Sequence, residues 1–197
     1  MGPCALARGK KNARRRDAWI VFQDESGISQ RPSVRRTWAP RGQTPVLVHA
    51  FNWQKMSLCA ALAYRGSTRR RARLFFQMKP NSYDSAALIA FLQDLRVELR
   101  GQPAILIWDG LPAHKSRIMQ AYLHAQRHWL RVERLPGYAP ELNPTESFWE
   151  NIKGQELANF CGDSLHAAAA QCRKGVRRVG QHTNLLFSFL KHAGLSF

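Results

Sequence analysis

Three acidic residues, Asp24, Asp109 and Glu146, have the types and positions that metal-dependent chemistry on phosphate requires. Asp24 and Asp109 each end a short apolar run, WIVFQD and AILIWD, and Glu146 lies near the start of a predicted helix. Two-metal phosphoryl transfer needs hard oxygen ligands that converge on ions about 3.5–4 Å apart. Short aspartates suit rigid strand ends, and the longer glutamate suits a helix that must reach the sheet. The pattern therefore predicts a divalent-metal site.

The neighbour of the first aspartate, Glu25, is the competing ligand at that strand end. Side chains of a strand alternate between its two faces. Asp24 therefore shares a face with Ile20 and Phe22, while Glu25 points to the opposite face. We favour Asp24 as the ligand for this reason.

Each acidic residue also has an interpretation without chemistry. The two aspartates are residue types that often begin turns after strands. Glu146 follows Asn143 and Pro144 with the spacing of a capping box, in which a glutamate side chain accepts from the backbone at the helix start. The ligand and cap interpretations of Glu146 have about equal weight from the residues alone.

The net charge points to a polyanionic partner. Thirty Lys and Arg face thirteen Asp and Glu, which gives a formal charge of +17. Neutralising phosphates with release of their counterions is the main binding contribution that does not depend on sequence. Nucleic acid is thus the expected partner, although a ribosomal-type protein or simply a basic surface would have similar composition.

Two segments contain candidate nucleic-acid contacts. Arg35, Arg36 and Arg41 surround Trp38, a mixture of cations and an aromatic ring that suits DNA backbones and unstacked bases. A structural tryptophan beneath an ordinary basic loop is the competing interpretation.

The second segment follows the second aspartate. His114 and Lys115 lie where a helix is predicted to begin, and the positive end of a helix beside a lysine is a natural phosphate contact. A solvated first helical turn fits these two residues equally well.

The surrounding pattern predicts an α/β fold. Apolar and β-rich runs predict five strands and amphipathic runs predict helices, with helical segments after 143 that break near Gly162 and Gly180. The predicted strands are 19–24, 55–64, 71–78, 104–109 and 130–136, and the first two helices are 84–100 and 115–127. Hairpins followed by alternating helices and strands indicate a ribonuclease-H-like mixed five-stranded sheet flanked by helices. In that sheet the first strand and the strand after the first helix are adjacent, which brings Asp24 close to Asp109.

Cysteine spacing and hydropathy constrain the compartment. The four cysteines form no CxxC pair, so we expect free, mostly buried thiols, which suit a reducing cytoplasm. We expect no signal peptide and no membrane span, and we predict a cytoplasmic, nucleoid-associated protein.

At these residues the chain resembles a known family, the IS630 group of transposases within the Tc1/mariner superfamily of DDE enzymes. The resemblance runs from about residue 10 to about residue 160. It is strongest in the segments VFQDESGI, RRTWAPRGQTPVL, ILIWDGLPAHKS and LPGYAPELNPTESFWENIK. The last segment is the most specific of the four.

The resemblance implies a metal-binding triad of Asp24, Asp109 and Glu146, with 36 residues (110–145) between the last two. Asp24 would bridge two Mg²⁺ or Mn²⁺ ions, and Asp109 and Glu146 would each hold one. The implied reaction is cleavage of DNA at transposon ends followed by transfer of the 3′ hydroxyl to target DNA. The resemblance adds Lys153 to the expected DNA contacts and implies a possible homodimer.

Two departures from the family pattern are visible. Gly110 stands where relatives usually carry asparagine, directly after the second aspartate. Relatives also begin with helix-turn-helix DNA-binding segments, which this chain does not show. We therefore divide it into a basic linker remnant (1–16), a catalytic domain (17–161) and a C-terminal helical extension (162–197). A separately encoded helix-turn-helix half is the implied partner.

Three functions remain open from the sequence. The leading one is a DDE transposase catalytic domain, a metal-dependent endonuclease and strand transferase. The alternatives are a truncated, inactive DNA-binding remnant of a transposase and a ribonuclease-H-like nuclease without a role in transposition.

Overall fold

The computed structural model describes residues 17–49, 54–65, 71–136 and 139–196, so the predicted linker remnant lies outside the described residues. The strands are β1 (Trp19–Ser29), β2 (Lys55–Arg65), β3 (Arg71–Pro80), β4 (Ala104–Trp108) and β5 (Leu130–Arg134). The helices are α2 (Ser85–Glu98), α3 (Pro112–Lys115), α4 (Arg117–Ala125), the 3₁₀ turn η1 (Pro140–Leu142), α5 (Pro144–Gln155), α6 (Leu165–Gln181) and α7 (Thr183–His192).

The strands form one mixed sheet in the order β3-β2-β1-β4-β5. β1 pairs antiparallel with β2 and parallel with β4, and β4 pairs parallel with β5. The predicted mixed five-stranded sheet is confirmed, including the adjacency of the first strand and the strand after the first long helix. β1 is longer than predicted, because its pairing with β2 continues past Asp24 to Ser29.

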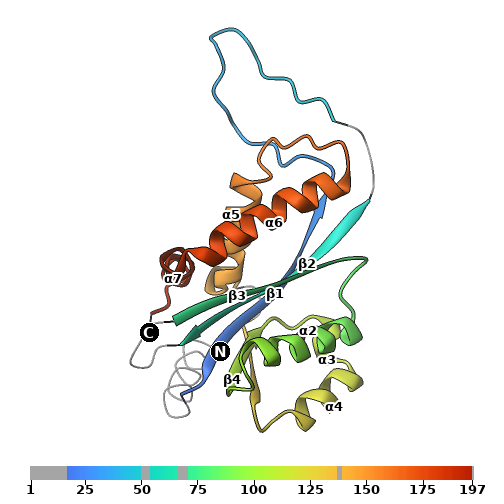
Figure 1. Cartoon of the computed structure of the whole chain (residues 1–197), viewed down its shortest axis with the longest axis vertical. Coiled ribbons are helices and arrows are strands. Elements are labelled where there is room, and N and C mark those ends of the chain that lie inside the picture. The colour runs from blue at the N-terminus through green and yellow to red at the C-terminus, as the bar shows by residue number, and fades with distance from the viewer. Residues whose placement is uncertain (1–16, 50–53, 66–70, 137–138, 197) are drawn as a thin grey trace.

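Helices cover both faces of the sheet, as Figure 1 shows, with α5, α6 and α7 on one side and α2, α3 and α4 on the other. Alternation along β1 separates the two cores. Ile20 and Phe22 pack with the C-terminal helices, whereas Trp19 and Val21 pack with α2 and α4. The near-continuous apolar sequence of β1 is what a strand buried on both faces requires.

The ends of α2 follow the sequence signals. Asp84 is the N-cap, and its carboxylate accepts from the Ala87 amide at 2.8 Å. Gly101, at φ +66°, ends the helix by donating to the Arg96 carbonyl at 2.8 Å.

The predicted helix 115–127 is in fact two helices. Ser116 has extended backbone angles and separates α3 from α4, and its side chain caps α4 by accepting from the Met119 amide. A serine side chain that satisfies an amide of the following turn can begin a new helix. Lys115 is consequently the last residue of a four-residue helix and does not start a long one.

The last two helices belong to the same core as the sheet. Leu186 and Phe189 of α7 and Cys172 of α6 pack against the face that carries Phe22. The boundary between a catalytic domain (17–161) and a C-terminal extension (162–197) stays a prediction. In the structure the helices after residue 161 share one hydrophobic core with the sheet. In the described part of the chain no helix is long and apolar enough to cross a bilayer.

Between β1 and β2 the chain forms a long loop that projects away from the sheet and helices (Figure 1). Its described part, 30–49 and residue 54, contains no strand, only an isolated bridge between Ser33 and Ala158. Cys59 and Cys172 are buried free thiols, as expected, and Cys161 is free and half-buried.

Candidate active site

Asp24 lies within β1, and Asp109 directly follows the neighbouring parallel strand β4. Phe22 of β1 is the register partner of Ile107 of β4, and each aspartate comes two residues later in the chain. Parallel strands end at the same edge of a sheet, so this register brings the two carboxylates together. The contacts of Asp24 and Glu25 agree with the prediction that they occupy opposite faces of the sheet. Asp24 accepts a hydrogen bond from Trp149 of α5, and Glu25 contacts His114 of α3, on the other side.

Glu146 enters the same pocket from α5. Together with Asp24 and Asp109 it lines a pocket of about 690 Å³. The N-cap of α5 is Asn143, whose side chain accepts from the Thr145 amide, and the Asn143 amide donates to the Pro140 carbonyl at 2.9 Å. The backbone donor that a capping box would assign to Glu146 is thus already occupied. The position of Glu146 favours the ligand interpretation over the cap.

The surroundings of Asp24 disfavour the charged form of its carboxylate. Burial first, and then the negative charges of Glu146 and Glu25, together raise the pKa of Asp24 to about 7. One hydrogen bond opposes these effects, donated by Trp149 Nε1 to Asp24 Oδ2 at 3.1 Å. A carboxylate held beside like charges in a half-dry pocket is stabilised by a cation.

The Asp109 carboxylate is paired with the buried side chain of His114. His114 Nδ1 lies 2.9 Å from Asp109 Oδ1, and His114 Nε2 lies 3.3 Å from Glu25 Oε1. Burial alone lowers the pKa of His114, but the bonds to Asp109 and Glu25 outweigh it and raise the pKa to about 9. The imidazolium therefore bridges two carboxylates at neutral pH.

The pKa of Asp109 moves the other way from that of Asp24. Burial raises it, but hydrogen bonds from His114 and from the Leu111 amide, with the charges of His114 and Lys115, outweigh burial and hold the pKa below its usual value. The two aspartates thus differ, because among the described residues the cations His114 and Lys115 lower the pKa of Asp109 and no cation lowers that of Asp24.

The structure corrects the expected role of His114. Its side chain is 1% exposed, so it is not accessible to a phosphate, and its bonds to two carboxylates explain the burial. Lys115 does line the triad pocket. It lies over Gly110, since a Cβ placed there would be 3.1 Å from Lys115 Nζ. The glycine that departs from the family pattern is therefore covered by a lysine.

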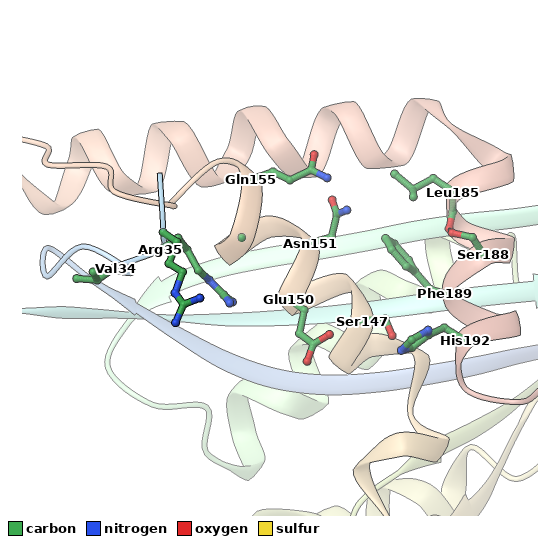
Figure 2. Close-up of a pocket in the computed structure, with 12 residues that line it drawn as sticks. Val34, Arg35, Ser147, Glu150, Asn151, Gln155, Leu185, Ser188, Phe189 and His192 are labelled. Atoms are coloured by element: carbon green, nitrogen blue, oxygen red, sulfur yellow. The ribbon is translucent and has the colours of Figure 1, made fainter. Parts of the chain in front are cut away.

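The other expected DNA contacts lie outside the triad pocket. Arg35 and Arg36 line a separate cavity of about 1000 Å³ between the start of the long loop, α5 and α7. Figure 2 shows Arg35 across this cavity from His192, with Glu150 between them along its wall. The backbone of Arg35 is fixed by Asn159, which accepts from its amide at 2.8 Å and donates to its carbonyl at 2.9 Å.

Trp38, Arg41 and Lys153 occupy three further positions. The Trp38 side chain is 100% exposed, which excludes the interpretation that it is a structural tryptophan beneath the loop. Arg41 is exposed on the same loop. Lys153 donates to Ser26 Oγ at 2.7 Å and lines a smaller pocket beside the last residues of β1.

Sequence reasoning missed the groups that orient the aspartates. Trp149 packs in the core between α5 and the sheet, and its indole nitrogen also donates to the Asp24 carboxylate. Glu25 was set aside as a ligand, yet it anchors His114. Helical spacing offers a signal for Trp149, because it follows Glu146 by three residues and shares its face of the helix.

The donor set fits divalent ions with oxygen preference. All three triad side chains are carboxylates, the ligands that Mg²⁺ and Mn²⁺ prefer. Within the ranges that the structure describes, no three His, Cys, Asp or Glu side chains converge tightly enough to hold one ion together. Shared binding of two ions needs fewer protein ligands for each ion, and the raised pKa of Asp24 shows that burial and the like charges around it disfavour its ionised form.

Comparison with known structures supports the fold. The mariner Mos1 paired-end complex with Mg has a TM-score of 0.64 at 20% identity, over 97% of this chain and 57% of that chain. The Mos1 transposase paired-end complex with left transposon end has a TM-score of 0.62 at 19% identity, over 97% and 58%. The Mos1 catalytic domain has a TM-score of 0.53 at 17% identity, over 98% and 90%.

The chain therefore spans less than two thirds of the length of the paired-end complex chains, and it has the fold of the Mos1 catalytic domain. No curated protein sequence matches it. The family model of DDE superfamily endonucleases matches residues 19–164, which include all three triad positions. The chain belongs to the DDE superfamily of endonucleases.

Proposed function

We propose that this chain is the catalytic domain of an IS630-group transposase of the Tc1/mariner superfamily, which cleaves DNA at transposon ends and transfers the freed strand to target DNA. The observation that carries the proposal is the meeting of Asp24, Asp109 and Glu146 in one pocket from two strands and a helix. The similar solved structures include complexes of Mos1 transposase with a transposon end, with Mg and with Mn.

The proposed roles are those that the family resemblance implies for the three residues that line the pocket. Asp24 would be a ligand of both of two Mg²⁺ or Mn²⁺ ions, while Asp109 and Glu146 would each be a ligand of one. When bound, the ions supply Lewis-acid activation of the attacking oxygen and stabilisation of the leaving oxygen. The protein contributes fixed donors: Trp149 orients Asp24, and the α5 cap at Asn143 fixes the helix that carries Glu146.

Both reactions are substitutions at phosphorus. In cleavage, a water oxygen bonds to phosphorus and its proton passes to solvent, the bond to the 3′ oxygen breaks, and that oxygen takes a proton from solvent to become a 3′ hydroxyl. In strand transfer, this hydroxyl bonds to a target phosphorus and loses its proton, and the displaced target 3′ oxygen gains one. No side chain has to act as the base, since the ligands are carboxylates that must remain ionised.

Cleavage by the purified chain tests the proposal. With Mn²⁺ and supercoiled DNA it is expected to produce nicks, and Asp109→Ala is expected to reduce the rate at least roughly a hundredfold, because a lost metal contact removes several kcal/mol of transition-state stabilisation. Gel analysis of nicked product measures the rate, and Glu141→Ala in the exposed 3₁₀ turn serves as control.

Three outcomes are informative. Nicking that survives Asp109→Ala would refute the site. Salt-sensitive DNA binding without any metal-stimulated nicking would favour the inactive transposase remnant. Nicking without joining of a 3′ hydroxyl to a second DNA would favour a nuclease without a role in transposition.

Lys115 is proposed as a phosphate contact within the triad pocket. Lys115→Ala is expected to weaken DNA binding on all sequences alike and to reduce the slope of log affinity against log salt by about 1. Fluorescence anisotropy at several salt concentrations measures this. Lys191→Ala removes the same charge from an exposed position of α7, and an equal change in that variant would show that only net charge matters.

The partners are proposed on the same basis. DNA with transposon ends and target DNA are the substrates, a separately encoded helix-turn-helix unit supplies end recognition, and a homodimer holds paired ends. Size-exclusion chromatography with light scattering, with and without end DNA, is expected to show dimer formation on DNA. A monomer on every end sequence tested would contradict the dimer.

A further inference from the structure

His114 lies between one triad carboxylate, that of Asp109, and the half-buried carboxylate of Glu25 outside the triad. Its Nδ1 faces Asp109 Oδ1 at 2.9 Å, and its Nε2 faces Glu25 Oε1 at 3.3 Å. Both partners accept hydrogen bonds, so the ring satisfies them by donating from both nitrogens. The imidazole therefore fixes the distance between the end of β4 and the middle of β1 through side chains.

The ring itself is immobilised by packing. His114 stacks on Trp108 with a centroid distance of 4.0 Å and an interplanar angle of 7°. The backbone on either side is also anchored, since Ser85 donates to the Ala113 carbonyl and Gln120 donates to the His114 carbonyl. A ring held on its face and at its backbone has little freedom to turn away from Asp109.

Asp109 is held through one oxygen only. Oδ1 accepts from the Leu111 amide at 3.1 Å and faces His114 Nδ1, while among the described residues no bond falls on Oδ2. Two donors on Oδ1 set the plane of the carboxylate. Oδ2 is left as the oxygen available to a ligand in the pocket.

Glu25 is held in turn by its neighbours, at an energetic cost. Gln23 Nε2 donates to Glu25 Oε1 at 2.9 Å and also contacts Cys59 Sγ at 3.2 Å. Gln23 Oε1 and Glu25 Oε2 are buried with no hydrogen-bond partner among the described residues. Burying polar atoms without partners destabilises a fold, so stability alone does not account for this cluster.

We propose that His114 is a positioning residue that fixes the carboxylate of Asp109 for ion binding, and that Glu25, oriented by Gln23, fixes His114. The inference rests on the proposed function, because it concerns the ions that the triad would hold. Partners outside the ligand set that orient a ligand typically change metal affinity or activity by roughly 10- to 100-fold when they are lost.

The test compares Mn²⁺ binding and Mn²⁺-dependent nicking in matched variants of the full chain. His114→Phe keeps a flat ring to stack on Trp108 but removes both nitrogens, and Glu25→Gln keeps an acceptor oxygen for His114 while it removes the charge. His124→Phe is the control, because His124 lies exposed on α4 and its contact is with Arg127. Titration calorimetry measures Mn²⁺ affinity without DNA, and thermal melting without metal reports folding.

The expected result has two parts. His114→Phe weakens Mn²⁺ binding roughly 10- to 100-fold, and Glu25→Gln weakens it by at least roughly threefold, while His124→Phe leaves it unchanged. The Mn²⁺ concentration for half-maximal nicking rises by the same factors, and kcat at saturating Mn²⁺ changes much less. If His114 only stabilised the position of α3, His114→Phe would lower the melting temperature and leave the Mn²⁺ affinity of the folded protein unchanged.

The failures are distinguishable. If the unaltered chain binds no Mn²⁺, the proposed metal site is wrong and the inference falls with it. If the unaltered chain binds Mn²⁺ and folded His114→Phe binds it equally well, the positioning role alone is wrong. If His114→Phe does not fold, the Glu25→Gln variant decides, and unchanged Mn²⁺ affinity in that variant overturns the proposal.

Discussion

Asp24→Asn is expected to stabilise the metal-free protein by up to about 4 kcal/mol near pH 8 while it abolishes metal-dependent nicking. The reason is the environment of Asp24, where burial and the charges of Glu146 and Glu25 raise the pKa from 3.8 to about 7. Asparagine keeps an acceptor oxygen for Trp149 Nε1 and removes the charge. Destabilising charge that is retained in a protein often marks a functional site.

The pH dependence gives the sign of this effect. A raised folded-state pKa contributes stability that is fully present below the unfolded value of about 4 and is lost as the pH rises through about 7. The stability difference between Asp24→Asn and the unaltered chain is therefore expected to be near zero at about pH 4 and to grow until about pH 7. Chemical denaturation in EDTA across this range measures it.

The matched control is Asp163→Asn, which removes an exposed carboxylate in the connection between α5 and α6. The difference in the free energy of unfolding between Asp163→Asn and the unaltered chain should not change with pH over the same range. Addition of Mn²⁺ should stabilise the unaltered chain and the control but not Asp24→Asn. An Asp24→Asn variant that is less stable than the unaltered chain at pH 8 would show that Asp24 is held by contacts that need its charge, against the metal assignment.

Glu146→Gln is expected to remove most of the stabilisation by Mn²⁺ and to leave metal-free stability nearly unchanged. Saturating Mn²⁺ at about one hundred times its dissociation constant stabilises a one-site protein by about 2.7 kcal/mol. Glu146 is exposed and the capping donor at Asn143 is already bonded, so the metal-free fold does not depend on its charge. Thermal melts with and without Mn²⁺ measure both quantities.

Asn143→Ala separates the cap from the ligand. The Asn143 side chain caps α5, and loss of such a cap costs about 1 kcal/mol. This variant should melt earlier without metal and keep most of its Mn²⁺ shift, the reverse of Glu146→Gln. Equal behaviour of the two variants would mean that Glu146 supports the helix start and that the ligand assignment is wrong.

Much of the fold could be predicted because its signals are local. Continuous apolar runs around Phe22 and Ile107 predict strands buried on both faces, and Asp84 and Gly101 mark the ends of α2. The strand order followed from hairpin and helix connections. The split at Ser116 was not predicted, because apolar spacing continues through it and only the serine side chain bonded to Met119 interrupts the helix.

The sequence by itself identified the candidate residues of the site and the chemistry proposed for them. Asp24, Asp109 and Glu146 were identifiable from strand ends, a helix start and a specific family motif, since residue type and local position limit what a carboxylate can do. Their convergence in one pocket was an expectation that depended on the sheet topology, and the structure places all three there.

Only the tertiary structure decided which residues orient the triad. Trp149 reaches Asp24 across 125 residues of sequence, and His114 reaches Glu25 across 89. No local pattern encodes such pairs, because each depends on the register of β1 against β4 and on how α5 packs over the sheet. The same packing buried His114, for which the sequence had offered either a phosphate contact or a solvated helical turn, and made it a partner of the carboxylates.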